Sequence, residues 1–463
     1  MPYLLNLIYV GLLLLASPFM LYRAVRHGKY REGWGPKLLG RVGRREGSGP
    51  CVWFHAVSVG EINVLRTLVR QFQEAYPNVE LVVSTTTQTG YEVANRIYSG
   101  LKVFYCPMDF TWSVRRAVAG IRPDLLVMAE LEIWPNLIRE MNRRGRSVAI
   151  VNGRLGEKSF RGYYQLRFFA KRVLKWMQTI AVQHDAYAQR FIRLGAAPTA
   201  VHVTGSMKFD GAETDRNNPR TRRLAKLTGW KAEQTVFLAG STVEPEERIV
   251  LQAFDGLRKQ YPQLRLILVP RHPERFDQVA LMLDESNHRW QRRSELQDGA
   301  LHPHTKVLLV DTVGELADWW GVADVGFVGG SLEGRRGGQS MIEPAAYGVA
   351  VCFGPYTHNF RGTVQLMRDQ QAAVIVEEAQ QLTRFVGQCL EDPQYAKELG
   401  RRAAQLVRQQ LGATRRTLDL LIADLLRITD ADPPAGRIDP AHVSQAAPRI
   451  KESKTESARK SRH

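Results

Sequence analysis

Short apolar runs alternate with helical periods along most of this chain, and this alternation constrains its fold more than any other feature. A first series of strand-like runs covers 51–56, 79–84, 102–105, 125–129, 147–151, 179–182 and 200–204. After a polar stretch over 210–223, a second series covers 236–239, 265–269, 306–310, 325–328, 349–353 and 373–376. Strands that alternate with helices pair in parallel through crossover helices. The sequence therefore predicts an α/β protein with two Rossmann-like, doubly wound domains.

The length of 463 residues is too great for one ordinary core, which supports the division into two domains. We expect the domains to face a central cleft, with closure as the expected motion. The predicted parts are a transmembrane anchor over 1–22, a basic juxtamembrane segment over 23–49, domains over 50–207 and 208–427, and a disordered basic tail over 428–463. Of the two helices predicted near 393–410 and 413–426, one is a candidate to cross back onto the first domain.

The N-terminal segment has the pattern of an uncleaved anchor. The first 22 residues carry no charged side chain, and residues 3–22 are long enough to cross a bilayer as a helix. Basic residues follow this run rather than precede it, which disfavours a cleaved signal peptide. Eight Lys and Arg lie between 23 and 45 against Glu32 alone, so this flank is predicted to stay cytoplasmic and to contact anionic headgroups. Pro18 either kinks the helix or makes it a shallow anchor.

Charge and cysteine content limit the classes of partner. The net charge of +18 points to an anionic partner, which is nucleic acid, membrane phosphate or a charged substrate. Without a zinc finger, an aromatic-rich RNA-binding strand or a low-complexity tail, we predict no nucleic-acid partner. The four cysteines are far apart in the sequence and are predicted to be buried thiols, not a metal site or a disulfide set. HExxH, GxSxG, Walker A and DxD motifs are absent, so zinc hydrolysis, serine hydrolysis and P-loop chemistry have no support.

Glu61 follows the first strand-like run and opens an amphipathic helix. The apolar face of that helix is formed by Ile62, Leu65, Val69 and Phe72. A carboxylate beyond the carboxyl end of a parallel strand lies where α/β proteins place their ligand chemistry. The alternative is that Glu61 only complements the helix dipole in the first turn.

Two further segments of the first half carry charged side chains. Residues 128–135 end an apolar strand with Glu130 and Glu132, whose spacing on an extended chain would direct them to the same side. One of them is expected to serve a reaction while the other caps the helix at Trp134. Lys208 lies at the domain junction, where it either reaches into the cleft or is a surface lysine in a hinge.

The second half contains a predicted nucleotide site. Residues 325–355 read as a strand, a glycine-rich loop, a short helix starting near Ser340 and another strand. Gly337 and Gly338 allow the backbone to approach an anion at the helix N-terminus, and Glu343 is placed to accept hydrogen bonds from ribose hydroxyls. The alternative is a plain glycine-rich turn. Arg271, at the end of a strand, is suited to clamp a phosphate or carboxylate.

In order and combination these segments resemble the 3-deoxy-D-manno-octulosonic acid (Kdo) transferase family, which are membrane-anchored glycosyltransferases with two Rossmann-like domains (the GT-B fold). The resemblance extends to about residue 426. It rests on residues 58–61, 130–135, 152–155, 204–210, 270–275, 314–316, 329–331 and 343–345.

The resemblance implies inverting transfer of Kdo from CMP-Kdo to a phosphorylated lipid A precursor, lipid IVA, in lipopolysaccharide biosynthesis, without a bound metal or other cofactor. It implies that Glu61 is the general base and that Glu130 and Lys208 stabilise the transition state. The domain over 50–207 would bind the acceptor and the domain over 208–427 the CMP-sugar, at the cytoplasmic face of the inner membrane. The implied CMP-binding residues are Pro270, Arg271, Gly314, Glu315, Leu316, Ser340, Met341, Ile342 and Glu343.

One departure from the family pattern keeps alternatives open. Residues 337–343 read Gly-Gly-Gln-Ser-Met-Ile-Glu, where the family usually has Gly-Gly-His-Asn-Pro-Leu-Glu. The backbone cradle survives this change because it needs only glycines and N–H groups, but the contacts of the His and Asn side chains are altered. A second hypothesis is therefore another GT-B glycosyltransferase that uses a different nucleotide-sugar, such as a UDP-sugar, on a membrane lipid acceptor. A third is a non-enzymatic, membrane-bound nucleotide-binding protein, against which the combination of Glu61, Glu130 and Lys208 argues.

Overall fold

The computed structural model describes residues 2–27, 34–231, 233–296, 300–334 and 336–429. The tail predicted over 428–463 lies almost wholly outside these residues. The chain forms two compact units, Met1–Asp210 with Gly412–His463, and Gly211–Leu411. Each unit contains a seven-stranded sheet, and all strand pairs are parallel, which confirms the predicted α/β class.

The first unit has the strand order β3-β2-β1-β4-β5-β6-β7. Its strands are β1 (Cys51–His55), β2 (Glu80–Thr85), β3 (Lys102–Tyr105), β4 (Leu125–Ala129), β5 (Ser147–Gly153), β6 (Thr179–Val182) and β7 (Val201–Val203). Its helices are α1 (Pro2–His27), α2 (Trp34–Leu39), α3 (Val59–Ala75), α4 (Gln88–Ile97), α5 (Thr111–Ile121), α6 (Pro135–Arg143), α7 (Glu157–Gln165), α8 (Arg167–Leu174), α9 (Asp185–Arg193) and α18 (Ala413–Thr429).

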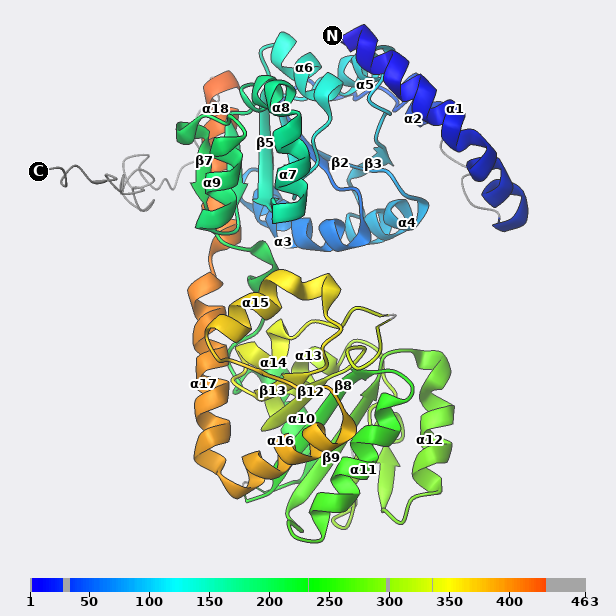
Figure 1. Cartoon of the computed structure of the whole chain (residues 1–463), viewed down its shortest axis with the longest axis vertical. Helices are drawn as coiled ribbons and strands as arrows, with labels where there is room; N and C mark the ends of the chain where they lie inside the picture. The colour runs from blue at the N-terminus through cyan, green and yellow to red at the C-terminus, as the bar shows by residue number, and fades with distance from the viewer. Residues whose placement is uncertain (1, 28–33, 232, 297–299, 335, 430–463) are drawn as a thin grey trace, which may run out of the picture. The chain divides into compact units, whose positions relative to one another are not determined.

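The strands of this unit are apolar on both faces because helices cover both. Along β1, Cys51 and Trp53 belong to one core cluster, and Val52 and Phe54 belong to another. Such two-sided burial produces continuous apolar runs instead of an alternating pattern, and it explains why the runs were visible in the sequence. Helix α18, the last of the described helices, packs on α3, β5 and β6, so it lies among elements formed by the first half of the chain (Figure 1).

The second unit has the strand order β10-β11-β9-β8-β12-β13-β14. Its strands are β8 (Thr235–Thr242), β9 (Leu264–Pro270), β10 (Trp290–Arg292), β11 (Val307–Leu309), β12 (Val325–Val328), β13 (Ala350–Phe353) and β14 (Val374–Ile375). Its helices are α10 (Pro219–Thr228), α11 (Glu246–Arg258), α12 (Phe276–Asp284), α13 (Leu316–Trp319), α14 (Ile342–Ala346), α15 (Arg361–Asp369), α16 (Ala379–Glu391) and α17 (Pro393–Gln410). Strand β10 was not predicted, because its three residues are only partly buried and form no apolar run.

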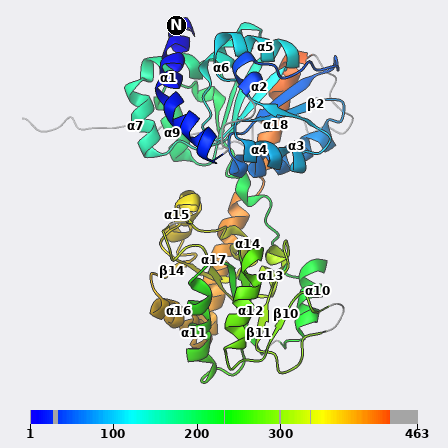
Figure 2. The same cartoon turned by 90° about the vertical axis from the view of Figure 1, so that its right-hand side faces the viewer.

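The N-terminal helix bears on the transmembrane anchor predicted over 1–22. Helix α1 forms as expected, with Pro18 inside it. Among the residues that the structure describes, however, no helix has the length and apolar character that crossing a membrane requires. Polar side chains within the run pack on the protein: Asn6 is buried and donates to Thr111 Oγ1 at 2.8 Å, and the Tyr9 hydroxyl donates to Asp109 at 3.2 Å. Figures 1 and 2 both show α1 beside α5 and α6 at the surface of this unit.

In the basic segment that follows, one arginine packs into the first unit. Arg45, predicted to meet headgroups, is buried and donates to the Ile121 carbonyl at 2.9 Å and the Gly49 carbonyl at 2.8 Å. It also pairs with Glu80 at 3.0 Å. This arginine therefore joins the chain before β1 to the end of α5 and the start of β2.

Candidate active site

Each unit places several of its candidate residues at the point where the strand order reverses. In the first unit, consecutive strands extend from β1 in one direction, whereas β4 pairs on its other side. In the second unit, β8 lies between β9 and β12 in the same way. Crevices at the carboxyl ends of such neighbouring strands are the usual ligand sites of doubly wound sheets. The segments after β1 and β4, and those after β8, β9 and β12, are therefore the candidate site segments.

Glu61 closes a capping box at the start of α3. Ser58 is the N-cap, and its hydroxyl accepts from the Glu61 N–H at 3.3 Å and donates to Glu61 Oε1 at 2.8 Å. Glu61 Oε2 accepts from the Val57 N–H at 2.8 Å. Burial raises the pKa of Glu61, the hydrogen bonds from Val57 and Ser58 lower it, and the charge of Glu130 raises it further, with a net upward shift. The helix-cap role and a position suited to chemistry thus coexist in one side chain.

Glu130 and Lys208 form an ion pair. Their side chains meet at 3.0 Å between Oε1 and Nζ, and both remain partly exposed. Glu130 follows β4 with a positive φ of 56°, a conformation that non-glycine residues rarely adopt. That conformation replaces the extended geometry from which the sequence placed Glu130 and Glu132 on one side.

Asn152 holds the backbone beside Lys208. It lies fully buried near the end of β5, and its Oδ1 accepts from the Met207 N–H at 3.0 Å. Asp210, on the other side of Lys208, accepts from the N–H groups of Gly412 and Thr414 at the start of α18. The lysine therefore stands on a short 3₁₀ turn (Met207–Phe209) that is fixed on both sides. Sequence reasoning quoted Asn152 without giving it this role.

Glu132 completes a cluster of carboxylates. Its Oε2 accepts from the Trp134 indole at 3.0 Å. Burial, followed by the charges of Glu61 and Glu130, raises the pKa of Glu132 to about 7, against the hydrogen bond from Trp134. Because a neighbouring carboxylate disfavours ionisation, Glu61 and Glu132 each retain a proton more readily than an isolated glutamate would.

The prediction that one of these glutamates caps the next helix is wrong. Helix α6 receives no side-chain cap from Trp134. Its first N–H groups, of Asn136 and Leu137, donate instead to the two oxygens of Asp109 at 2.9 and 2.8 Å. Asp109 is buried, and this burial raises its pKa to about 7 in spite of those hydrogen bonds. Asp109 lies in the loop before α5, so spacing in the sequence gave no sign of its contact with α6.

In the second unit, a buried carboxylate shapes the glycine-rich loop after β12. Glu246 Oε2 accepts from the N–H groups of Val243 at 3.1 Å and Gly330 at 2.7 Å. Its Oε1 accepts from Ser331 at 2.9 Å and Leu332 at 3.0 Å. Burial raises the pKa of Glu246 despite these four hydrogen bonds. Sequence reasoning missed this residue, although its first-turn position after a strand matches that of Glu61.

The loop itself carries the backbone conformations that glycine permits. Gly337 and Gly338 both have φ of 80°, and the Gly338 N–H donates to the Gly330 carbonyl at 2.8 Å. Helix α14 begins at Ile342, two residues later than the predicted start near Ser340. The Ser340 hydroxyl donates to Glu343 and accepts from the Ile342 N–H at 3.4 Å. These two bonds close a turn over residues 340–343.

The other predicted CMP-binding residues lie after β9 and β11. Pro270 ends β9, and Arg271 is exposed, with its N–H bound to the Thr242 carbonyl at 2.9 Å.

In the segment after β11, Gly314 has φ of 96°. Glu315 receives both arms of the Arg293 guanidinium at 2.8 and 3.0 Å, and Leu316 begins α13. Burial raises the pKa of Glu315, but bonds from Thr312 and Arg293 outweigh it and lower the pKa. Glu315 therefore fixes its loop, leaving backbone groups as the available contacts.

The structure also bears on metal binding and on the cysteines. Within the described ranges, no group of three or more His, Cys, Asp or Glu is placed to hold a metal ion. All four cysteines are buried and free, as predicted.

Two doubly wound units with candidate sites in the loops after their strands are typical of the GT-B class of fold. UDP-GlcNAc 2-epimerase from Neisseria meningitidis, solved with UDP-GlcNAc, has a similar fold, with a TM-score of 0.52 at 12% identity over 81% of this chain and 100% of its own.

Sequence relatives identify the family within that class. A family model described as 3-deoxy-D-manno-octulosonic-acid transferase (kdotransferase) matches residues 30–211. The 3-deoxy-D-manno-octulosonic acid transferase of Haemophilus influenzae is 33% identical over 426 residues, which is 89% of this chain and 97% of the relative. That of Bordetella pertussis is 33% identical over 422 residues, 89% of this chain and 96% of the relative. The chain belongs to the Kdo transferase family and is a glycosyltransferase.

Proposed function

We propose that the protein transfers Kdo from CMP-Kdo to a phosphorylated lipid A precursor, with inversion, as a step of lipopolysaccharide biosynthesis. Membership of the family supports Kdo transfer. The observation that carries the residue assignment is the geometry around Glu61, whose carboxylate lies at the strand-order reversal with a raised pKa and within electrostatic reach of Glu130. Because its pKa is raised, Glu61 binds a proton more strongly than an ordinary glutamate, as a general base requires.

The proposed step begins at the acceptor hydroxyl. Glu61 takes the hydroxyl proton, and the oxygen attacks the anomeric carbon of Kdo from the face opposite the phosphate. The bond between that carbon and the phosphate oxygen breaks, and CMP leaves with the electron pair. Lys208, held by Glu130 at 3.0 Å, supplies positive charge that offsets the negative charge developing in this step.

The unit that includes 50–207 is proposed to bind the acceptor, and residues within 208–427 are proposed to bind the donor. The loop containing Gly337 and Gly338 is proposed to present backbone N–H groups to the CMP phosphate. The Arg271 guanidinium, exposed after β9, would pair with the phosphate or with the Kdo carboxylate. Ser340 and Glu343, whose side chains bond each other in this structure, are proposed to contact the ribose.

We further propose that the enzyme works at the cytoplasmic face of the inner membrane, with α1 lying on the bilayer. Leucines on the exposed side of α1 support this: Leu7 is 70%, Leu14 66% and Leu15 81% exposed. Several exposed leucines on one helix favour its contact with the apolar part of a bilayer over its contact with water.

The altered loop at 337–343 keeps a second candidate, a glycosyltransferase of the same fold with a different nucleotide-sugar. Product mass analysis separates the two. Incubation with CMP-Kdo and a tetraacylated disaccharide phosphate should add the mass of Kdo to the acceptor. Addition of a sugar from a UDP-sugar panel, with none from CMP-Kdo, would overturn the proposed donor.

A further inference from the structure

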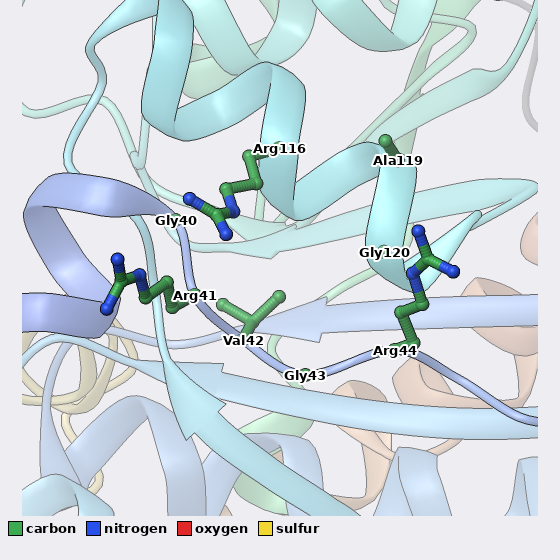
Figure 3. A pocket seen from close by; sticks show the side chains of 8 residues that line it. All are labelled: Gly40, Arg41, Val42, Gly43, Arg44, Arg116, Ala119 and Gly120. Atoms are coloured by element: carbon green, nitrogen blue, oxygen red, sulfur yellow. The ribbon is translucent and has the colours of Figure 1, made fainter.

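A basic pocket of about 340 Å³ lies in the first unit, outside the candidate active site (Figure 3). Arg41 and Arg44 reach it from the loop after α2, and Arg116 reaches it from α5. Glycines form much of the remaining lining, and none of the eight lining residues is acidic. A hollow of this volume accommodates a ligand rather than single waters.

The backbone of the pocket is held closely against α5. A side chain at Gly40, where φ is 62°, would place its Cβ 2.0 Å from the Ser113 carbonyl oxygen. A Cβ at Gly120 would lie 3.2 Å from the Gly43 carbonyl oxygen. The Arg45 N–H donates to the Gly120 carbonyl at 3.0 Å, which secures the far end of the loop. The arginines therefore project from a fixed support.

The three guanidinium groups differ from their neighbours in lacking a partner. Arg41, Arg44 and Arg116 are exposed, and within the described residues none makes a side-chain hydrogen bond or ion pair. By contrast, Arg45 pairs with Glu80 at 3.0 Å and Arg115 with Glu140 at 3.9 Å. Lys102 adds charge at the rim, because its Nζ donates to the Arg44 carbonyl at 3.0 Å. Unpaired guanidinium groups around one pocket are suited to a phosphate.

The pocket is separate from the carboxylate cluster. Its loop precedes β1, and Gly120 lies near the end of α5, shortly before β4. Glu61 and Glu130 instead follow the carboxyl ends of β1 and β4. Strands of this length span about 16 Å at roughly 3.3 Å per residue, so a ligand in the pocket does not contact the reacting groups.

Helix α5 also supports α1, through the bond from Asn6 to Thr111. The exposed leucines of α1 and the unpaired arginines of the pocket thus belong to one unit, and both groups adjoin α5. Apolar side chains for acyl chains together with guanidinium groups for phosphates are the two components of a lipid-surface contact. We propose that this pocket binds the phosphate of an anionic phospholipid headgroup, as a lipid site distinct from the acceptor site. The proposal does not depend on Kdo transfer.

The test compares Arg41→Gln/Arg44→Gln/Arg116→Gln in the full-length protein with a matched triple, Arg222→Gln/Arg223→Gln/Arg408→Gln, whose arginines are exposed on α10 and α17. Co-sedimentation with vesicles of phosphatidylcholine and phosphatidylglycerol is measured at fixed salt. Each pocket arginine should contribute about fivefold to binding, so the pocket triple should bind at least tenfold more weakly than the unaltered protein. The control triple should bind within about twofold of it, and both triples should keep the unaltered melting temperature.

Equal losses for the two triples would show unspecific charge attraction and overturn the proposal. Unchanged binding of the pocket triple would do the same. Millimolar inorganic phosphate provides the second arm. If it raises the melting temperature of the unaltered protein but not of the pocket triple, while both bind vesicles equally, the pocket takes free phosphate and the lipid assignment is wrong.

Discussion

The two candidate site regions differ in the kind of group that they are proposed to present to substrate. In the first unit, the groups proposed to face the reaction are charged side chains: Glu61, Glu130, Glu132 and Lys208. In the second unit, the proposed groups are backbone N–H groups of a glycine-rich loop, and the buried Glu246 organises part of that loop through three hydrogen bonds. Replacing a charge should therefore affect turnover in the first unit, whereas disturbing the backbone should affect nucleotide binding in the second. The following variants test that difference in order of expected effect.

Glu61→Gln should have the largest effect. The amide keeps an acceptor for the Val57 N–H but cannot take a proton, so turnover should fall by about a thousandfold. Release of CMP in the presence of acceptor is the measurement. Glu74→Gln, an exposed change on the same helix, is the control and should keep normal turnover. Near-normal turnover of Glu61→Gln would exclude it as the base.

Lys208→Met should lower turnover by about a hundredfold, because it removes the positive charge while keeping most of the side-chain volume. The loss should appear in kcat. Lys158→Met removes an exposed lysine of α7 and serves as the matched control. If only KM changed, Lys208 would bind substrate equally in the ground state and transition state.

Glu246→Gln should act on the other region. One of its oxygens becomes an amide N–H₂ that faces backbone donors, so the loop should rearrange and CMP should bind about tenfold more weakly, with the free energy of unfolding lower by about 1–3 kcal/mol. Calorimetric titration of CMP and urea denaturation measure the two effects. Glu391→Gln, at the exposed end of α16, should change neither. Unaltered CMP affinity would show that Glu246 does not shape the nucleotide site.

Asp109→Asn should have the smallest effect, on stability and its pH dependence. The folded-state pKa of Asp109 is raised to about 7 from an ordinary value of 3.8. Asp109 therefore contributes most stability below pH of about 4, and this contribution is lost as the pH rises to about 7. Asparagine does not titrate, so the decline of the unfolding free energy over this range should flatten, with an overall loss of about 1 kcal/mol from one weakened hydrogen bond. Urea denaturation from pH 4 to 8 gives the result, and an unchanged slope would contradict it.

The sequence revealed those parts of the fold in which burial follows local pattern. Strands buried on both faces appear as apolar runs, and the predicted apolar face of α3 is buried at Ile62, Leu65, Val69 and Phe72. Strand β10 lacks such a run and was missed. The N-terminal run was interpreted from hydropathy alone, which could not show that Asn6 and Tyr9 bind α5 and the loop before it.

For the candidate site, the sequence indicated the residues but not what holds them. Glu130 and Lys208 were both predicted as site residues, and Glu130 Oε1 lies 3.0 Å from Lys208 Nζ. The positive φ of Glu130 was not predictable, because an extended conformation is the default after a strand. Asp109 and Glu246 were missed because all but one of the N–H groups that they accept from lie 27 to 86 residues away, and such contacts exist only in the folded chain.

Titration of CMP into Glu61→Gln tests the division between the two regions most directly. A carboxylate that only accepts the acceptor proton has no part in holding the nucleotide. Calorimetry should therefore give a CMP dissociation constant within about twofold of the unaltered protein, while the same preparation shows almost no transfer. A dissociation constant that weakens in step with turnover would contradict the account, since Glu61 would then act on the nucleotide site.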